Sequence, residues 1–319
     1  MRFLGKYPSS LIAILSLLSF SIAMSAQEVS PPSKVDAQTR MIKLNVLVTD
    51  SSNRPVTDLR AEDFRVTEDG KQQAIEYFSR EELPVSYGIV VDASGSMRTL
   101  LDHILNAGKG VVASNKQGDE AFVMRFTDAD SIQIEQGFTS NKLALEEALD
   151  NIFVEGGLTA VMDAINRSID FLKKYKRSEE GAHRHQAIVL ITDGEDRGSR
   201  ARNMEALLSR LREEGVQFFI IGLTKMSNVQ GSRERAAGFL TRVAEVSGGR
   251  AFFPASPAEI PGVVSEIARD LRTQYVIGYT PTNVIPDGAF RKVQVTVAES
   301  PGRKKLNVIT RPGYVAPRL

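Results

Sequence analysis

The strongest constraint on the fold is a regular alternation of short apolar segments with amphipathic helical segments, which begins at Val85. Apolar runs between polar turns predict buried strands, and apolar residues at helical spacing predict helices with one buried face. Strands that alternate with helices form a mostly parallel sheet covered on both faces. We therefore expect a doubly wound, Rossmann-like α/β domain over residues 85–273. Its expected strands are residues 86–91, 120–126, 131–138, 187–192, 217–223 and 250–253, and its expected helices are residues 100–112, 141–152, 160–175, 203–214, 234–246 and 258–272.

The segments on either side of this domain are expected to be β-structure. Residues 41–49 alternate apolar and other side chains, and Asp69-Gly70 is a hairpin signal between expected strands. Each β-segment is too small to bury a core alone. We therefore expect residues 41–84 and 274–319 to form one small β-sandwich module, with the α/β domain inserted between its halves. The expected strands beside the hairpin turn are residues 64–68 and 74–78, and those near the end of the chain are residues 275–279, 291–298 and 306–310.

Residues 1–26 have the pattern of a signal peptide rather than of a folded element. Arg2 and Lys6 precede an apolar run at residues 11–23, which is shorter than the roughly 20 residues of a membrane-spanning helix. Small residues at the end of that run favour cleavage there, and retention as an uncleaved membrane anchor is the alternative. Residues 27–40 are polar and proline-containing, as is typical of a linker. This pattern predicts an exported protein, either periplasmic or secreted.

The composition narrows the function classes. The chain has 319 residues, of which 40 are basic and 39 acidic, so its formal charge of +1 does not favour binding to nucleic acid. It contains no cysteine, which excludes disulfides, a lipid-modified cysteine and a thiolate metal site.

Three loops beside the expected strands carry hydroxyl and carboxylate side chains. Asp92, Ser94 and Ser96 follow one buried strand, Thr159 precedes a helix after a Gly-Gly pair, and Asp193 follows another buried strand. Ligands of open parallel sheets bind beyond the carboxyl ends of the strands, so these side chains should converge. Two carboxylates and three hydroxyls form an all-oxygen shell that suits a hard cation such as Mg²⁺. Because both aspartates are expected at solvent-facing strand ends, their replacement should weaken metal binding without unfolding the chain.

The same five residues resemble the metal-ion-dependent adhesion site (MIDAS) of von Willebrand factor A (VWFA) domains, and the resemblance covers residues 85–272. It implies that Ser94, Ser96 and Thr159 ligate the metal directly or through water. It implies that Asp92 and Asp193 act through water or by holding the ligands. It also implies that a partner's Asp or Glu completes the metal's shell.

Further short motifs resemble a VWFA-related family described from acidobacteria, whose members are exported bacterial proteins of largely undefined role. The resemblance therefore supports the fold, the export and the metal site, and indicates little about the partner. The motifs are Val56-Thr57-Asp58-Leu59, Asp63-Phe64, Glu68-Asp69-Gly70, Gly278-Tyr279-Thr280-Pro281 and Arg311-Pro312-Gly313-Tyr314.

Residues near these loops have simpler interpretations. Asp163 is either a helix-surface residue or a group that steadies the loop before it. Glu195 and Asp196 are expected to be solvated surface, with a role in partner choice as the alternative. His183 and His185 lack a third zinc ligand and are expected to lie on the surface.

We expect a binding protein rather than an enzyme. A serine hydrolase needs a histidine beside its nucleophile, and the three histidines lie in a helix and a remote loop. A metallohydrolase generally needs histidine or several carboxylate ligands to activate water. The leading hypothesis is an adhesion or scaffolding protein that captures a protein partner's carboxylate through Mg²⁺, with Mn²⁺ or Ca²⁺ as other candidate ions. The alternatives are a metal that only stabilises the fold and a metal-dependent hydrolase.

Overall fold

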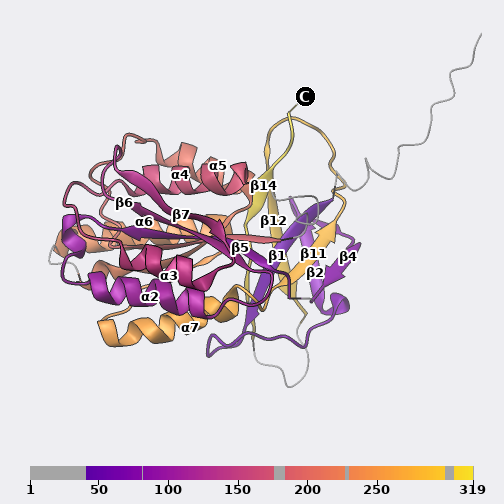
Figure 1. The fold of residues 1–319 in the computed structure, drawn as a ribbon. Helices are drawn as coiled ribbons and strands as arrows, with labels where there is room; N and C mark the ends of the chain where they lie inside the picture. The colour runs from indigo at the N-terminus through magenta and orange to yellow at the C-terminus, as the bar shows by residue number, and fades with distance from the viewer. Residues whose placement is uncertain (1–40, 81, 176–183, 227–229, 299–304, 319) are drawn as a thin grey trace, which may run out of the picture.

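The computed structural model consists of a larger α/β part beside a smaller β part (Figure 1). The expected signal peptide and linker, residues 1–26 and 27–40, lie outside the described residues. Within the described chain, no helix is both long and apolar enough to cross a membrane. The structure describes residues 41–80, 82–175, 184–226, 230–298 and 305–318.

The α/β part is built on a six-stranded sheet. All neighbouring strands are parallel except the last pair, in which β7 returns antiparallel along β6. A mostly parallel, doubly wound sheet is therefore confirmed. Its strand order is β10 (Arg250–Phe252), β9 (Gln217–Gly222), β8 (His185–Thr192), β5 (Val85–Asp92), β6 (Glu120–Phe126) and β7 (Ile132–Thr139).

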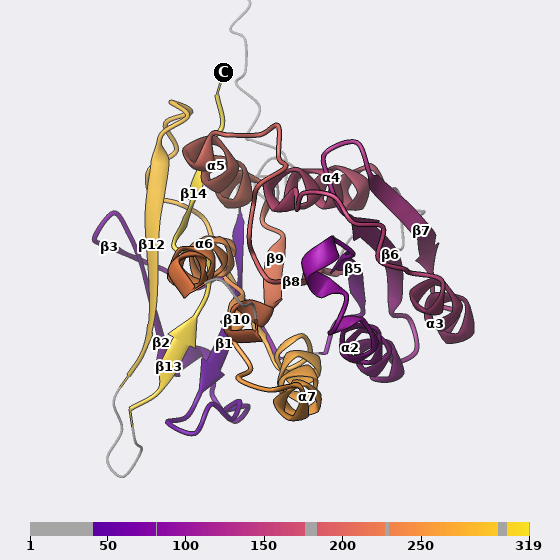
Figure 2. The same cartoon turned by 90° about the vertical axis from the view of Figure 1, so that its left-hand side faces the viewer.

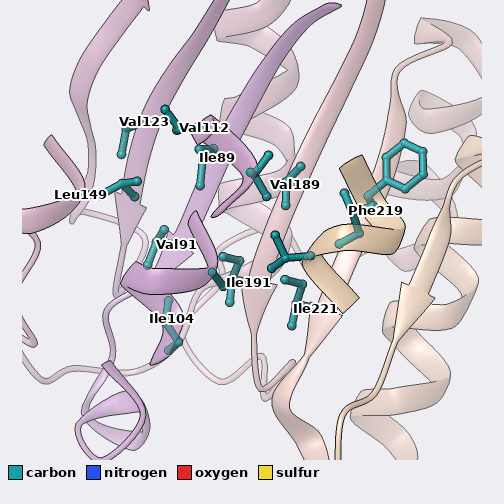
Figure 3. Packing of buried hydrophobic residues seen from close by; sticks show 14 of the residues in the cluster. Ile89, Val91, Ile104, Val112, Val123, Leu149, Val189, Ile191, Phe219 and Ile221 are labelled. Carbon is teal, nitrogen blue, oxygen red and sulfur yellow. The ribbon is translucent and has the colours of Figure 1, made fainter. Parts of the chain in front are cut away.

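Helices cover both faces of this sheet (Figure 2). Alternate residues of each central strand point to opposite faces, so that Ile89 and Val91 join one buried cluster and Val90 joins the other. Figure 3 shows the first cluster, in which Val189 and Ile191 of the neighbouring strand also take part. Each fully buried aliphatic side chain contributes about 1.5–3 kcal/mol, so these clusters fix the strand ends in place. One face carries α2 (Leu101–Ala113), α3 (Lys142–Asp150) and α7 (Ile260–Asp270), and the other carries α4 (Val161–Lys174), α5 (Met204–Glu214) and α6 (Gln230–Ser247).

The β part joins strands from both ends of the chain in two four-stranded sheets. In one, β1 pairs with β11, and in the other β2 pairs with β12, all antiparallel. The expected β-sandwich of N- and C-terminal strands is therefore confirmed. The first sheet has the order β13 (Asn307–Ile309), β1 (Ile42–Thr49), β11 (Tyr275–Tyr279) and β4 (Tyr77–Ser79), and the second has the order β14 (Gly313–Val315), β12 (Phe290–Val297), β2 (Phe64–Glu68) and β3 (Lys71–Gln73).

Two details of this part differ from the sequence prediction. The strand after the Asp69-Gly70 turn begins at Lys71 and ends at Gln73, so the predicted hairpin strand at residues 74–78 is wrong, and only its residues 77–78 lie in a strand. The later segment, β4, pairs instead with β11 in the other sheet. Strand β14 was not predicted. The described residues also form short 3₁₀ turns: η1 (Ala61–Asp63), η2 (Gly95–Met97), η4 (Leu223–Met226) and η5 (Pro257–Glu259).

Aromatic rings and one buried carboxylate hold the β part together. The ring centroid of Tyr275 lies 5.1 Å from that of Phe64 and 5.6 Å from that of Phe78. The buried Glu68 accepts hydrogen bonds from the hydroxyl of Tyr279 in the other sheet, at 2.7 Å, and from that of Tyr314 in its own sheet, at 3.0 Å. Each of these contacts joins an N-terminal strand to a C-terminal one.

His185 is buried, so its expected place on the surface is wrong. Its Nδ1 lies 3.1 Å from the carbonyl oxygen of Leu271, and its Nε2 contacts the side chain of Gln217. Burial lowers the pKa of His185. The other histidine of the pair, His183, lies outside the described residues.

Candidate metal centre

The two aspartates of the predicted site lie at the ends of the neighbouring strands β5 and β8. The Asp92 carboxylate accepts one hydrogen bond from the backbone N–H of Ser94, at 3.0 Å. Its other oxygen accepts a hydrogen bond from the hydroxyl of Thr192, at 2.6 Å. Asp92 therefore fixes its own loop and ties it to the strand end that carries Asp193.

The three hydroxyls of the predicted site meet beside these carboxylates. The Oγ of Ser94 lies 3.1 Å from the Oγ of Ser96 and 3.0 Å from the Oγ1 of Thr159. Ser94 stands at the N-terminus of η2, yet its hydroxyl does not cap this turn and faces the other hydroxyls. Ser94 and Thr159 are buried and Ser96 is exposed. The cluster is thus reached from solvent beside Ser96.

The carboxylates of Asp92 and Asp193 are both fully buried, which corrects the expectation of solvent-facing strand ends. Burial, and after it the negative charge of Asp193, raises the pKa of Asp92 from 3.8 to about 7. Burial also raises the pKa of Asp193, against hydrogen bonds from the Glu195 N–H and the Ser96 hydroxyl. One oxygen of Asp193, Oδ2, is buried without a hydrogen-bond partner. Two buried carboxylates with an unsatisfied oxygen beside three hydroxyls fit a bound cation.

The loop that carries Thr159 is fastened on two sides. Gly156 and Gly157 adopt φ of +92° and +85°, which L-amino acids with side chains rarely adopt, so they let the chain turn towards the site. The carbonyl oxygen of Thr159 accepts hydrogen bonds from the backbone N–H groups of Arg197 and Gly198, at 2.9 and 2.8 Å. The following N–H donates to the carbonyl oxygen of Thr127 at 2.7 Å. The position of Thr159 thus depends on the loops after β6 and β8.

Two acidic residues near the site form part of this fastening. Asp196 accepts a hydrogen bond from the N–H of Val161, the first residue of α4, at 2.9 Å. Asp163 accepts hydrogen bonds from the N–H groups of Arg200 and Ala201, at 2.6 and 3.0 Å. Both carboxylates therefore join the start of α4 to the loop after β8.

Sequence reasoning did not assign a role to Thr192 or Arg125. Thr192 is the last residue of β8, and its hydroxyl also accepts a hydrogen bond from the N–H of Gly194 at 3.0 Å. The buried Arg125 pairs with Glu135 and, at 2.6 Å, with Glu155, just before the Gly-Gly turn of the threonine loop. The only sequence signal for either was its place at the end of a strand.

The described residues contain no group of three or more His, Cys, Asp or Glu side chains placed to hold a metal ion. The candidate centre is of a different kind, because three of its five side chains are hydroxyls. Such a shell places fewer negative charges around an ion than a carboxylate cage.

The fold and this loop cluster define a class of protein: an open α/β sheet that gathers hydroxyls and carboxylates at the carboxyl ends of its strands. The family model described as the von Willebrand factor type A domain matches residues 88–266. This match spans more than half of the chain, and the chain belongs to that family.

Known structures resemble the chain in fold, whereas no curated protein sequence matches it. The von Willebrand factor type A protein from Catenulispora acidiphila has a TM-score of 0.50 and 13% identity, covering 80% of this chain and 73% of that one. Proximal thread matrix protein 1 from the mussel byssus, with a zinc-occupied MIDAS motif, has a TM-score of 0.48 and 20% identity, covering 64% and 49%. An aerotolerance-related membrane protein from Bacteroides fragilis NCTC 9343 has a TM-score of 0.44 and 18% identity, covering 58% and 98%.

Proposed function

We propose that the chain is an exported protein that captures a carboxylate of a protein partner through a divalent cation, with Mg²⁺ as the leading candidate and Mn²⁺ or Ca²⁺ as others. The hydroxyls of Ser94, Ser96 and Thr159 would hold the ion directly or through water. The carboxylates of Asp92 and Asp193 would act through water or by holding these groups. When bound, the ion supplies an electrophilic centre that accepts an oxygen ligand from outside the chain.

One observation carries this proposal: the hydroxyls of Ser96, in the same loop as Ser94, and of Thr159, in a separate loop, lie 3.1 and 3.0 Å from the hydroxyl of Ser94, beside two buried carboxylates. Without a cation, both carboxylates disfavour their charged forms, as their raised pKa values indicate. A cation would relieve both the charge repulsion and the unsatisfied oxygen of Asp193. The exposed side at Ser96 leaves room for a ligand from a partner.

We propose binding rather than catalysis for this centre. Hydroxyl ligands leave an ion electrophilic, so that it can accept a carboxylate from a partner. His185 pairs with Val85 at the amino ends of the strands, opposite to the candidate centre, and so is not placed to activate Ser94. Loss of a measured hydrolytic activity on Ser94→Ala would favour the enzymatic alternative.

Calorimetric titration with Mg²⁺ and Mn²⁺ tests the metal site. We expect Ser94→Ala to weaken affinity by about tenfold or more, since one hydroxyl ligand is lost. Ser265→Ala is the matched control, because this hydroxyl on α7 contacts only the Pro261 carbonyl oxygen at 2.9 Å in the described structure. Equal affinities of the wild type and Ser94→Ala would refute the assignment.

The alternative of a purely structural metal predicts a different result. A metal-dependent pull-down from the cell-envelope fraction, with and without chelator, is compared with thermal unfolding under the same conditions. The binding proposal expects chelator to abolish capture with little change in Tm. A large fall in Tm without any captured partner would favour the structural alternative.

Export is part of the proposal and has its own test. Mass spectrometry of the protein recovered from the periplasm or medium should find a mature N-terminus near residues 24–27, after the expected signal peptide. An intact N-terminus in the membrane fraction would support the uncleaved anchor instead.

A further inference from the structure

A cavity of about 500 Å³ is lined by residues that follow two of the loops of the candidate metal centre. Its wall includes Gly194, which follows Asp193, and Met162, which lies three residues after Thr159. Two of the three loops of the centre therefore continue into the cavity.

The walls of the cavity are mainly apolar and come from three helices. Met162 belongs to α4, Met204 is the first residue of α5, and Ala236 and Phe239 belong to α6. Figure 2 shows these helices on the same face of the sheet. Met204 is 38% exposed although it is a large apolar residue. Cavities of this size with mostly apolar walls are typical of ligand-binding sites.

The polar groups of the cavity are held in place by one another. Glu195 accepts hydrogen bonds from the guanidinium of Arg197 and from the hydroxyl of Ser232. The N–H of Glu195 donates to the carboxylate of Asp193 at 3.0 Å. Glu195, which binds Arg197 and Ser232 in the cavity wall, is thus also hydrogen-bonded to Asp193 of the candidate metal centre.

The backbone of Gly194 joins the cavity to the centre without a gap. Its φ is +77°, and a Cβ at this position would lie 2.8 Å from Leu240 and 3.3 Å from Ala236 of α6. The loop after Asp193 therefore packs directly on the helix that forms the cavity wall.

We propose that this cavity receives an apolar side chain, such as Leu, Met or Phe, of the same partner segment whose carboxylate binds at the metal centre. This inference rests on the proposed carboxylate capture and adds the chemistry of the partner: an Asp or Glu with a large apolar residue close to it in sequence. We choose this occupant because Gly194 and Met162 line the cavity and closely follow Asp193 and Thr159 of the metal centre. The metal centre supplies the affinity for the acid, and the cavity supplies the selectivity between acidic segments.

The first test uses a probe without a carboxylate. In protein labelled at the methionine methyl groups, N-acetyl-leucinamide at millimolar concentration should shift the NMR signals of Met162 and Met204. The signal of the buried Met97, in the turn that carries the serines, should not move with this probe. An absence of any shift at Met162 and Met204 would overturn the proposal.

The second test joins the two sites. In Mg²⁺, N-acetyl peptide amides with an Asp and a Leu separated by zero, one or two glycines are compared with the same peptides carrying Gly for Leu. For the best spacing we expect the leucine peptide to bind about tenfold more tightly, as burial of one leucine side chain implies. Equal binding of the two peptides in Mg²⁺ would overturn the cavity inference and leave carboxylate capture standing.

Paired variants separate the cavity from the centre. Met204→Glu should remove the leucine advantage and keep both Mg²⁺ affinity and binding of the glycine peptide. Leu143→Glu is the matched control, because Leu143 is also exposed in the first turn of a helix. It lies away from the centre: it closely follows Thr139, which pairs with Ala121 at the start of β6. It should leave all three quantities unchanged. If neither peptide responds to Mg²⁺ while N-acetyl-leucinamide still shifts both signals, carboxylate capture fails, and the linked proposal fails with it.

Discussion

At the scale of single residues, the chemistry of the candidate centre depends on burial. Asp92 and Asp193 are fully buried although each follows a strand and belongs to a loop. The sequence indicated which residue types would meet, because carboxylates and hydroxyls after buried strands share one edge of a parallel sheet. It did not indicate that the two aspartates are buried, because their burial depends on contacts between loops far apart in the sequence. Ser94 contacts Thr159, 65 residues away, and Asp92 contacts Thr192, 100 residues away. Thr192 was given no role for a related reason: a threonine at the end of a strand is ordinary strand composition.

The raised pKa of Asp92 predicts that metal binding depends on pH. An aspartate whose folded pKa is about 7 holds a proton that the unfolded chain has released above 3.8. Its stabilising contribution to the metal-free fold is therefore complete below pH 3.8 and is lost as the pH rises through about 7. The same proton competes with the cation, so Mg²⁺ affinity should fall by roughly tenfold per pH unit below about pH 7. Calorimetry at about pH 8 and about pH 6 measures this.

The matching variant for this prediction is Asp92→Asn, which cannot titrate. It should bind Mg²⁺ weakly at both pH values, with most of the pH dependence lost. Its metal-free form should unfold at a higher temperature than the metal-free wild type at about pH 8, where the buried charge is present, and not at about pH 4. A wild type with the same Mg²⁺ affinity at both pH values would contradict the raised pKa.

At the scale of elements, the start of α4 determines where Thr159 lies. Asp196 caps α4 from another loop by accepting the N–H of Val161, and Asn141 caps α3 by accepting the N–H of Leu143 at 3.0 Å. Loss of either cap should cost about 1 kcal/mol of stability. Asp196→Ala should in addition weaken Mg²⁺ binding, because the threonine loop loses a fastening. Asn141→Ala should leave Mg²⁺ binding intact. Chemical unfolding and calorimetry on both variants test this, and equal Mg²⁺ affinities would mean that the cap does not position Thr159.

A second element-scale prediction concerns the ion pairs beneath the threonine loop. Arg125→Leu leaves the half-buried Glu135 and Glu155 without their cation, which should cost about 3 kcal/mol of stability. Arg200→Leu is the control, since both members of the Arg200–Asp130 pair are more than 70% exposed and the pair should contribute less than about 1 kcal/mol. Urea unfolding measures both changes. Equal losses of unfolding free energy in the two variants would show that burial does not make the Arg125 ion pairs more stabilising.

The elements that could be predicted are those with a complete local pattern. The long apolar strands and the amphipathic helices of the α/β part can be predicted from the periodicity of their apolar residues. Strands β3, β4 and β14 have three residues each, too few to define a pattern by themselves. Strands β10 and β13 are as short, but they lie within the longer predicted segments at residues 250–253 and 306–310. Their pairing depends on partners more than 190 residues away in the case of β4 and β11. Nothing local to residues 71–79 could assign β3 and β4 to different sheets.

At the scale of the whole molecule, the α/β part is an insertion in the β part. It has two buried clusters of its own, one on each face of its sheet. The β part has one cluster, drawn from both ends of the chain. The N-terminal strands β1 and β2 find their main partners in β11 and β12, which come after the insertion. The two parts should therefore differ in whether they can fold without the rest of the chain.

Fragments of the chain test this difference. Residues 41–83 alone should show no cooperative thermal transition by circular dichroism, because their cluster lacks Tyr275, Ile277 and Tyr279. The same residues joined to residues 274–318 by a short Gly-Ser linker should unfold cooperatively, since β4 already pairs with β11 beside the junction. Residues 84–273 alone should fold and retain Mg²⁺ binding. Cooperative unfolding of residues 41–83 by themselves would show that the N-terminal segment is an independent unit, and the split module would then be wrong.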